Sequence, residues 1–246
     1  RFRRVTGVQT CALPISVVSE DGDLNILTFN DEEGKLAFRH TASHVLAQAV
    51  KRLYPEAKLA IGPAIEDGFY YDFDMAPLTR EDLDAIEKEM KKVIKENPPI
   101  ERYELPREEA IAYMKEKDEP YKVELIEDLP EDATISFYKQ GDFTDLCAGP
   151  HLMSVKPIKA FKLTASSGAY WRGNENNKML TSIYGTAYTK KADLEERLKY
   201  LEEIKLRDHN RLGREMELFT TVDVIGQGLP LLLPKGAKII QTLQRW

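Results

Sequence analysis

Two short motifs bring together residue types that bind metals or take part in hydrolysis. The first, DLCAGPH, contains Cys147 and His151 with a Gly-Pro pair between them. Because Gly and Pro mark a turn, we expect these two side chains to lie on a loop that directs both at one point. The second motif, HTASH, contains His40 and His44. In a helix, residues four positions apart lie on the same face, so this pair can also converge.

Together the motifs supply three histidines and one cysteine, which is a plausible zinc donor set. Two other interpretations of the helical pair stay open, namely burial in the core and exposure to solvent. An apolar stripe projects to the face roughly opposite the pair, which disfavours the core interpretation. That stripe consists of Leu46, Ala49, Val50 and Leu53. His209, in a charged stretch, is interpreted as solvent-exposed.

Composition narrows the class of protein. The chain has 246 residues, of which 42% are hydrophobic and 31% charged, with a net charge of −6. It lacks a run of 18 apolar residues, so no membrane span is predicted. A nucleic-acid partner would need a local basic patch, because the whole chain is acidic. Two cysteines in a chain of this length argue against a disulfide framework and for a reducing compartment.

Residues 1–16, RFRRVTGVQTCALPIS, are treated separately from the fold. The apolar part is too short for a signal peptide and lacks a small-residue cleavage pattern. The stretch from Val5 to Ile15 reads like a translated sequencing adapter and is interpreted as an assembly artefact, the alternative being a genuine disordered terminus. This interpretation excludes Cys11, so Cys147 is the one cysteine considered as a site residue.

The elements that must position the motifs follow from periodicity and capping. Alternation predicts a strand over 23–29, and Asn30 with Glu33 fits a capping box that opens a helix ending before Pro55. Residues 59–75 indicate a hairpin, and Thr79 with Asp82 opens a second amphipathic helix that ends at 97–99. A third helix is predicted over 106–117, with Pro106 at its start.

The remaining segments indicate the fold class. Strand-like segments follow at 134–140, 158–166, 169–173 and 178–188. Helices and strands alternate irregularly, so an α+β fold is predicted. A long charged helix is predicted over 191–217 and resembles a linker between domains. Residues 218–246 are predicted to begin another domain.

Six ordered motifs resemble the editing domain of the bacterial threonyl-tRNA synthetases. They are RHTASH, IGPAIEDGFYYDF, YKVELI, DLCAGPH, GAYWRGNENNKML and IYGTAY. The resemblance implies helices packed on a mostly antiparallel sheet for residues 31–190. It implies that 17–30 end a ubiquitin-like domain, that 191–217 form a linker helix, and that 218–246 begin a truncated class II aminoacylation domain.

The resemblance also implies a function. The longer parent would charge threonine tRNA with ATP, which this chain is expected not to do. The expected activity is editing, the hydrolysis of serine wrongly attached to threonine tRNA. His40, His44, Cys147 and His151 would line the site, Lys122 would help to position water, Asp145 would bind the amino group of the substrate, and Tyr71 would donate a hydrogen bond. Without the resemblance, Lys122 and Asp145 would be interpreted as surface residues and Tyr71 as hairpin packing.

Cofactors and partners are expected on the same basis. Editing is expected to need no cofactor, although zinc at His40, His44, Cys147 and His151 stays open. ATP, Mg and a catalytic-domain zinc would belong to the full-length parent. The chain is expected to be cytoplasmic and monomeric, whereas the parent would be a homodimer.

Residues 152–181 suggest where threonine tRNA would bind. They carry five basic residues against one acidic residue, Glu175, and are predicted to face phosphate groups. Trp171 is predicted to stack on the terminal adenine, with Arg172 beside it in the substrate site. The alternative is a core tryptophan among solvated lysines. The basic residues are Lys156, Lys159, Lys162, Arg172 and Lys178.

Two further functions remain as alternatives. One is a free-standing aminoacyl-tRNA editing deacylase, which would have no reason to carry the class II segment GLPLLLPKGAKI. The other is a non-enzymatic module in which zinc only ties a helix to a loop. Substitution of Lys122 or Asp145 would abolish hydrolysis in an editing protein and would not matter in the zinc module.

Overall fold

The computed structural model describes residues 5–6, 26–222, 224–226 and 228–246. The chain divides into two compact units, 1–194 and 195–246, each described here by itself. A two-residue strand β1 (Val5–Thr6) pairs in parallel with β2 (Ile26–Leu27). The expectations for residues 1–4 and 7–25 lie outside the described residues, and in the described part of the strand predicted over 23–29 Ile26 and Leu27 form β2.

The first unit contains a large antiparallel sheet. Its strands are β3 (Lys58–Leu59), β5 (Gly68–Asp74), β10 (Met179–Tyr188) and β9 (Ala160–Tyr170) in that order, with β4 (Ala64–Ile65) also on β5. The β4–β5 pairing is the hairpin expected within 59–75. Along β5, Phe69, Tyr71 and Phe73 alternate into the core and are fully buried. The side chain of Tyr71, one of the predicted site residues, is therefore held in the core between two phenylalanines.

A smaller antiparallel sheet carries the cysteine motif. It consists of β6 (Ile100–Glu104), β7 (Ser136–Gln140) and β8 (Phe143–Leu146). Between β6 and β7 the chain forms α3 (Arg107–Glu116) and α4 (Pro120–Glu127), which share a hydrophobic cluster with Phe137. No element was predicted for the segment that became α4, although Pro120 in its first turn is a common helix start. Cys147 and His151 follow directly after β8.

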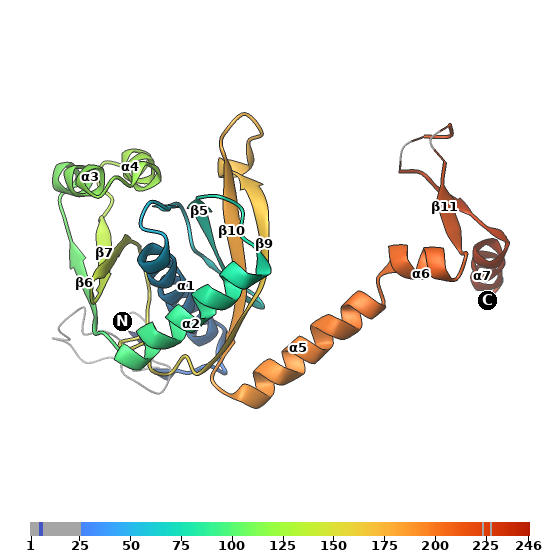
Figure 1. Ribbon diagram of the computed structural model, residues 1–246, viewed down its shortest axis with the longest axis horizontal. Helices are drawn as coiled ribbons and strands as arrows, with labels where there is room; N and C mark the ends of the chain where they lie inside the picture. Colours follow the sequence, from blue (N-terminus) through green and yellow to red (C-terminus); the bar gives the residue numbers. More distant parts are fainter. Residues whose placement is uncertain (1–4, 7–25, 223, 227) are drawn as a thin grey trace. The chain divides into compact units, whose positions relative to one another are not determined.

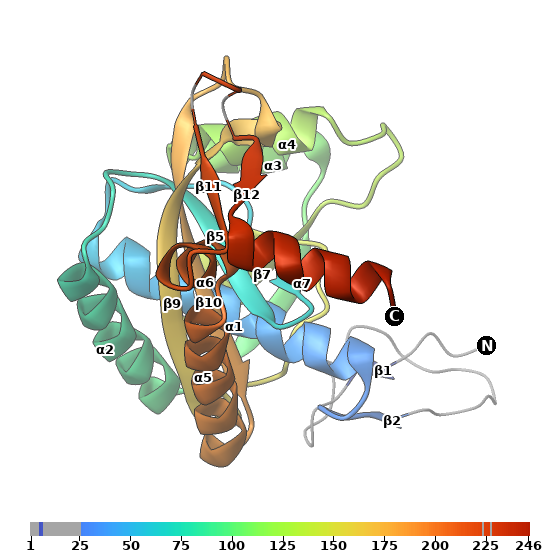
Figure 2. The ribbon, with the colours of Figure 1, turned by 90° about the vertical axis from the view of Figure 1, so that its right-hand side faces the viewer.

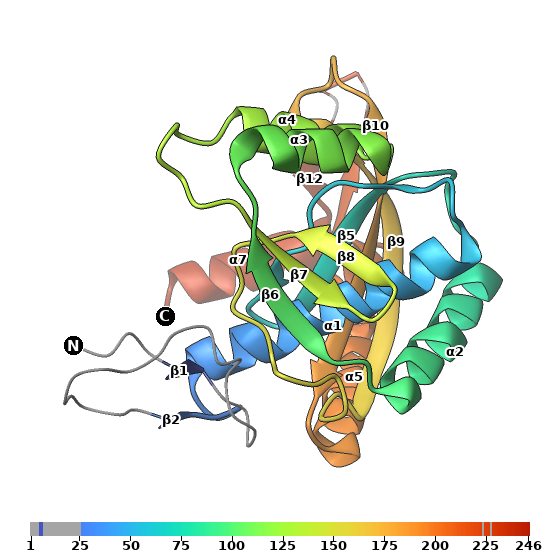
Figure 3. The ribbon, with the colours of Figure 1, turned by 90° about the vertical axis from the view of Figure 1, so that its left-hand side faces the viewer.

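Helix α1 (Glu32–Leu53) lies between the two sheets (Figures 1 and 3). Its hydrophobic cluster reaches Tyr71 of the large sheet and Tyr138 of the small sheet. Fourteen of its residues are buried, whereas Leu53, assigned above to the apolar stripe, is 39% exposed. The predicted division into an apolar face and an opposite histidine face was therefore wrong. Between residues 37 and 50 the helix is covered on both sides, and its exposed residues lie toward its two ends.

The start of α1 also differs from the prediction. Its N-cap is Asp31 rather than Asn30, and no side-chain capping bond forms. The Asp31 carboxylate instead accepts the backbone N–H of Thr28 at 2.7 Å and closes the preceding turn. The Asp31 side chain therefore stabilises the turn before α1 and does not cap the helix.

Helix α2 (Arg80–Glu96) packs against α1 and β9 (Figure 2). The predicted capping box is present, with Thr79 and Asp82 bonded reciprocally. Leu83, Ile86, Met90 and Val93 are buried as expected, and the helix ends at Asn97 in the left-handed region.

Most of α5 and the elements after it belong to the second unit. The charged segment predicted as one helix over 191–217 forms two, α5 (Lys191–Leu206) and α6 (His209–Glu215). The break arises because Asp208 accepts the backbone N–H of Arg211 at 2.8 Å and starts a new helix. A β11–β12 pair (Phe219–Thr221 with Pro230–Leu232) and α7 (Pro234–Gln244) follow. No helix in the described part of the chain is long and apolar enough to cross a membrane.

Candidate functional site

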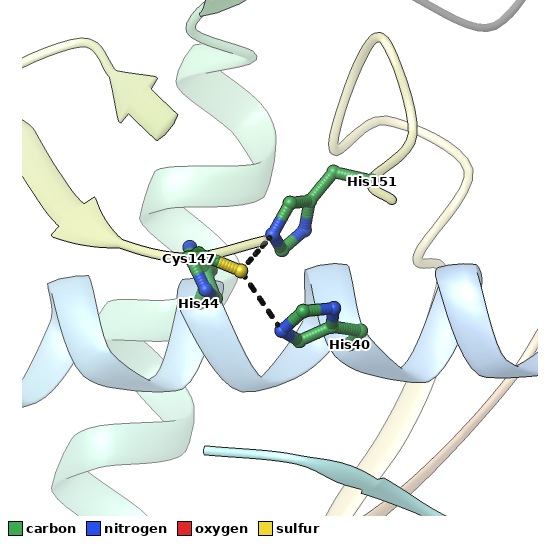
Figure 4. A group of neighbouring side chains, drawn as sticks. All are labelled: His40, His44, Cys147 and His151. Carbon is green, nitrogen blue, oxygen red and sulfur yellow. Dashed lines mark hydrogen bonds between the residues drawn. The ribbon is translucent and has the colours of Figure 1, made fainter. Parts of the chain in front are cut away.

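The four predicted ligands converge on one point (Figure 4). His40 and His44 project from α1, whereas Cys147 and His151 come from the loop after β8. The Cys147 Sγ lies 3.3 Å from His40 Nε2 and 3.2 Å from His151 Nε2. All four ligand atoms lie within 4.8 Å of one another. The convergence expected from the two motifs is therefore present.

Backbone groups and a hydroxyl surround this cluster. The Cys147 Sγ accepts the N–H of Gly149 at 3.2 Å, and the His40 ring donates to the Pro150 carbonyl. The Nδ1 of His151 lies 3.3 Å from the hydroxyl oxygen of Thr41. The loop and helix thus hold the rings from outside the cluster, which is the usual support for metal or catalytic histidines.

A second group of side chains lies beside the first. The Lys122 Nζ is 2.7 Å from Asp145 Oδ1, and both side chains are almost fully buried, at 4% and 2% exposure. Tyr71 donates its hydroxyl to Asp145 Oδ2 at 2.5 Å. His44 Nε2 lies 3.7 Å from the same oxygen. Asp145 therefore joins the Lys122–Tyr71 group to the histidine cluster.

Burial dominates the electrostatics of the cluster. It lowers the pKa of His40 to about 4 and that of His44 to about 3, and it places the pKa of His151 well below its usual range. Burial also raises the pKa of the Cys147 thiol to about 12. At neutral pH without metal, the cluster therefore holds three neutral imidazoles and a neutral thiol.

The pKa of Asp145 is not shifted in the direction that burial favours. Burial alone would raise its pKa, but the Lys122 ammonium, together with His44 and Tyr71, outweighs burial and lowers the pKa below its ordinary value. Burial, reinforced by the negative charge of Asp145, raises the pKa of Tyr71 well above its usual range. The site therefore carries one carboxylate, one ammonium and a neutral phenol.

A pocket of about 530 Å³ lies beside these groups. Its wall includes His40, His44, Lys122, Asp145 and Cys147, but not Tyr71 or His151. The rest of the wall is mostly apolar and is formed by Leu36, Ala37, Ile61, Gly62, Pro63, Ala64, Leu125, Leu146, Ala148, Gly149 and Pro150. Apolar walls with a few convergent polar groups are typical of small-molecule sites.

Two glycines are required for this close packing. A Cβ at Gly149 would lie 2.1 Å from the Tyr138 hydroxyl oxygen, and the residue has a φ of 73°. A Cβ at Gly62 would lie 2.0 Å from the Tyr71 ring. Both positions thus admit only a residue without a side chain.

Trp171 and Arg172 do not line this pocket. Trp171 is 6% exposed, packs with Ala60 and Leu180, and donates its indole N–H to Glu124 at 3.0 Å. Arg172 pairs with Glu124 at 2.9 Å and with Asp128. The ring faces of Trp171 are covered by protein, so the stacking on an adenine predicted above is not available in this conformation.

The predicted basic patch is largely neutralised. Lys162 pairs with Glu87 at 2.9 Å and Lys178 with Asp74 at 2.7 Å, in addition to the Arg172 pairs. These acids lie far away in the sequence, so counting charges within 152–181 missed them. Lys156 and Lys159 are exposed and form no ion pair with any residue the structure describes.

The cluster fits a zinc ion by donor type, and its two sulfur–nitrogen contacts also fit by spacing. Tetrahedral zinc with these ligands would separate neighbouring donor atoms by about 3.5 Å. The Sγ–nitrogen separations of 3.3 and 3.2 Å are close to that value. The donor set could therefore hold zinc through His40, His44, Cys147 and His151.

Comparison with known proteins shows which proteins the chain is similar to. Residues 135–184 match the family described as the threonyl and alanyl tRNA synthetase second additional domain. Threonine–tRNA ligases of Clostridium botulinum (strain Alaska E43 / Type E3) and Acetivibrio thermocellus are 66% and 61% identical over 230 residues. The chain is thus similar to threonine–tRNA ligases over most of its own length, and its residues 135–184 match the model of the second additional domain.

The similarity has a defined extent. It covers 93% of this chain but only 36% of the length of each of these two relatives. The α+β fold of the threonyl and alanyl synthetase second additional domain is the fold described above. The matched family segment contains Asp145, Cys147 and His151 but not the histidines of α1, which the structure adds to the same site.

Sequence reasoning missed two kinds of residue in this site. Gly62 lies within IGPAIEDGFYYDF, where nothing shows that a tyrosine ring nine residues later will need its space. Thr41 lies between the two histidines of HTASH, and its contact with His151 spans 110 residues. A hydroxyl next to a ligand histidine was the available signal.

Proposed function

We propose that this site edits tRNA by hydrolysing the ester between serine and the 3′ end of threonine tRNA. One observation carries the proposal: an ionised Asp145 paired with Lys122 lies in the same pocket as the histidine–cysteine cluster. The relationship to threonine–tRNA ligases supports the choice of tRNA and amino acid.

The similarity of serine to threonine explains why a hydrolytic site, separate from the site that charges the tRNA, would be needed. Serine lacks one methyl group of threonine, which changes binding by only about 1–3 kcal/mol. A site that admits the smaller ester and excludes the larger supplies the missing discrimination. Gly62 lines the pocket and packs directly on the buried Tyr71 ring, which leaves no space for a side chain at this position and suits a sieve of this kind.

The charged groups have separable roles in this proposal. The Asp145 carboxylate is buried, is ionised and lies beside the cluster, and it would receive the ammonium group of the substrate. Lys122 would stabilise the negative charge that develops on the ester carbonyl oxygen. The Tyr71 hydroxyl holds Asp145 in place through its 2.5 Å hydrogen bond.

Hydrolysis then requires an oriented water. Its oxygen attacks the carbonyl carbon, the carbon–oxygen bond to the ribose breaks, and the ribose oxygen takes up the proton that the attacking water loses. Free serine and tRNA with a free terminal hydroxyl result. Because burial lowers the pKa of His40 to about 4, the imidazoles are weak bases and would act mainly by orienting the water.

We propose that the reaction needs no metal. A zinc ion held by all four donors would have a closed coordination sphere with no position for water. If bound with one donor displaced, zinc would supply Lewis acidity and a more acidic water. In either case, the residues that contact the substrate are Asp145 and Lys122.

The first test is deacylation of threonine tRNA charged with serine or with threonine, with and without a strong chelator. We expect serine-selective hydrolysis that survives chelation. Loss of activity on chelation and its recovery with zinc would overturn the metal-free part of the proposal. No hydrolysis by folded protein under either condition would contradict editing by this chain.

A second candidate function is a zinc-bound structural module, which the tight four-donor cluster favours. Lys122→Met separates the two functions. In the editing protein it abolishes hydrolysis, whereas in the structural module it leaves zinc binding unchanged. Lys178→Met, which removes an equivalent charge outside the pocket, is the matched control.

The wider assignment rests on the same relatives. We propose that residues 31–190 form the editing domain, that 191–217 link it to a following region, and that 218–246 belong to a class II aminoacylation domain. In a longer homodimeric protein, that domain would charge threonine tRNA using ATP. A chain of residues 17–194 that folds and retains serine-selective hydrolysis would support this division, and one that folds without activity would contradict it.

A further inference from the structure

Thr41 makes contacts that the proposed mechanism does not use. It lies on α1 between the two ligand histidines and is fully buried. Its hydroxyl oxygen has three neighbours: the Ala37 carbonyl at 2.8 Å, the Leu152 backbone N–H at 2.9 Å and the His151 Nδ1 at 3.3 Å. These three contacts use the full hydrogen-bonding capacity of a hydroxyl, which is one donor and two acceptor positions.

The identity of each partner decides the direction of its bond. The Ala37 carbonyl can only accept, so it takes the single hydroxyl proton of Thr41. The Leu152 N–H can only donate and occupies one lone pair. The remaining lone pair can be satisfied only by a proton on His151 Nδ1. The opposite tautomer would place two lone pairs against each other.

This count fixes the other side of the ring. A neutral imidazole with its proton on Nδ1 has a lone pair on Nε2. In this structure the His151 Nε2 lies 3.2 Å from the Cys147 Sγ and faces the centre of the cluster (Figure 4). The inward lone pair can therefore accept the thiol proton, bind a water proton or ligate a metal.

We propose that Thr41 is a positioning residue that sets the tautomer and the ring orientation of His151. The hydroxyl binds the ring and, through the Leu152 N–H, the backbone of the next residue, so the end of the loop is fixed at two points. The tautomer assignment stands on these contacts alone. Its effect on hydrolysis rests on the proposed function.

The direct test is the tautomer of His151, read from a long-range ¹⁵N–¹H correlation spectrum of the intact chain in chelator. The His151 signals are assigned by their loss in His151→Asn. We expect the Nδ1–H form in the wild type and in Thr41→Ser, which keeps the hydroxyl. Thr41→Val keeps the shape but removes the hydroxyl, and should give a mixture of tautomers or the Nε2–H form.

Thr181→Val is the matched control, because Thr181 is also buried and donates its hydroxyl to a carbonyl, that of Met75, away from the cluster. It should leave the His151 signals unchanged. An Nε2–H form in the wild type, or an unchanged Nδ1–H form in Thr41→Val, would overturn the proposal. If Thr41→Val does not fold, the wild-type and Thr41→Ser spectra still decide the tautomer.

Deacylation gives the second readout. Supporting residues of this kind typically contribute about 10- to 100-fold to activity. We expect a loss of that size in Thr41→Val and wild-type activity in Thr41→Ser and Thr181→Val. If the tautomers behave as expected while the wild type itself does not hydrolyse seryl-tRNA, the proposed function fails and the role of Thr41 in orienting His151 stands. Full activity in Thr41→Val with an altered tautomer would overturn a role in hydrolysis.

Discussion

Among single residues, the buried Lys122–Asp145 pair is expected to affect both the stability of the domain and the proposed hydrolysis. Both side chains are almost fully buried, so removing one partner leaves an uncompensated charge in the interior. We expect Lys122→Met to lower the free energy of unfolding by about 3–5 kcal/mol, measured by urea denaturation. The control Lys178→Met removes an exposed ion pair and should cost at most about 1 kcal/mol.

The double variant Lys122→Met/Asp145→Leu separates structure from function. Replacing both charges with apolar groups should restore much of the lost stability, because no buried charge remains unpaired. Hydrolysis of seryl-tRNA should stay absent in both variants. Recovery of hydrolysis together with stability would show that the pair is only structural.

The buried histidines predict how stability depends on pH in metal-free protein. In the folded state, burial lowers the pKa of His40 to about 4 and of His44 to about 3, from an unfolded value of 6.5. Below pH 6.5 the unfolded chain therefore binds protons that the folded chain does not, and stability falls by up to about 1.4 kcal/mol per pH unit for each histidine. The lowered pKa of Asp145 adds a further loss below about pH 4.

The Cys147 thiol affects the stability of the folded protein at high pH. Burial raises the pKa of Cys147 from 9.0 to about 12, so the unfolded chain loses this proton first and stability falls above about pH 9. Urea denaturation in chelator should thus show maximal stability between about pH 6.5 and 9. His44→Gln should reduce the acid slope, and an unchanged slope would contradict burial of a neutral His44.

The sequence was enough to identify the cluster residues but not all of their neighbours. His40, His44, Cys147 and His151 could be grouped because few other residues of those types exist in the chain. The prediction that Trp171 stacks on the terminal adenine took no account of the hydrogen bond from its indole N–H to Glu124, because Glu124 lies 47 residues away in the sequence. Pairings of this length leave no local periodic signal.

At the scale of elements, the turn after β8 determines whether its two ligands meet α1. Gly149 has a φ of 73°, and a Cβ there would lie 2.1 Å from the Tyr138 hydroxyl oxygen. We expect Gly149→Ala to lower stability and to reduce hydrolysis at least tenfold, measured by urea denaturation and deacylation. The turn must shift to avoid the clash and would move Cys147.

Gly173→Ala provides a matched control for that variant. Gly173 has a similar φ of 67°, but a Cβ there would meet nothing within 4 Å. It should lose about 1–2 kcal/mol from backbone strain and keep full hydrolysis. Equal loss of hydrolysis in both variants would show that strain, and not the clash with Tyr138, is responsible.

Elements with a local cause were the easier ones to predict. The α2 helix follows from its Thr79–Asp82 box and its apolar face, both of which are local. The position of α1 was misjudged because its environment is set by two sheets that are distant in sequence. Periodicity reports one buried face and cannot distinguish a surface helix from one enclosed on both sides.

For the whole molecule, charge distribution predicts how tRNA binding responds to salt. The net charge is −6, and three of the five basic residues proposed to face phosphate are paired with acids. We expect the double variant Lys156→Gln/Lys159→Gln to reduce the slope of log affinity against log salt by about 1.5. Filter binding of threonine tRNA across a salt series measures this slope.

The paired lysines are the controls for that measurement. Lys162→Gln and Lys178→Gln should change the slope little, because each lysine already has a carboxylate partner. A larger effect from these two than from Lys156 and Lys159 would mean that tRNA displaces the acids. The phosphate-facing surface would then have to be assigned again.

The enclosed position of α1 has a consequence for how the protein matures. The contact between His40 and Cys147 joins residues 107 positions apart, and α1 is covered only after β7 and β8 have formed on one side and β10 on the other. Non-local contacts of this kind form late in folding. Under the proposed editing function, a chain in which the loop after β8 has not yet met α1 would lack the assembled site and would not hydrolyse aminoacyl-tRNA.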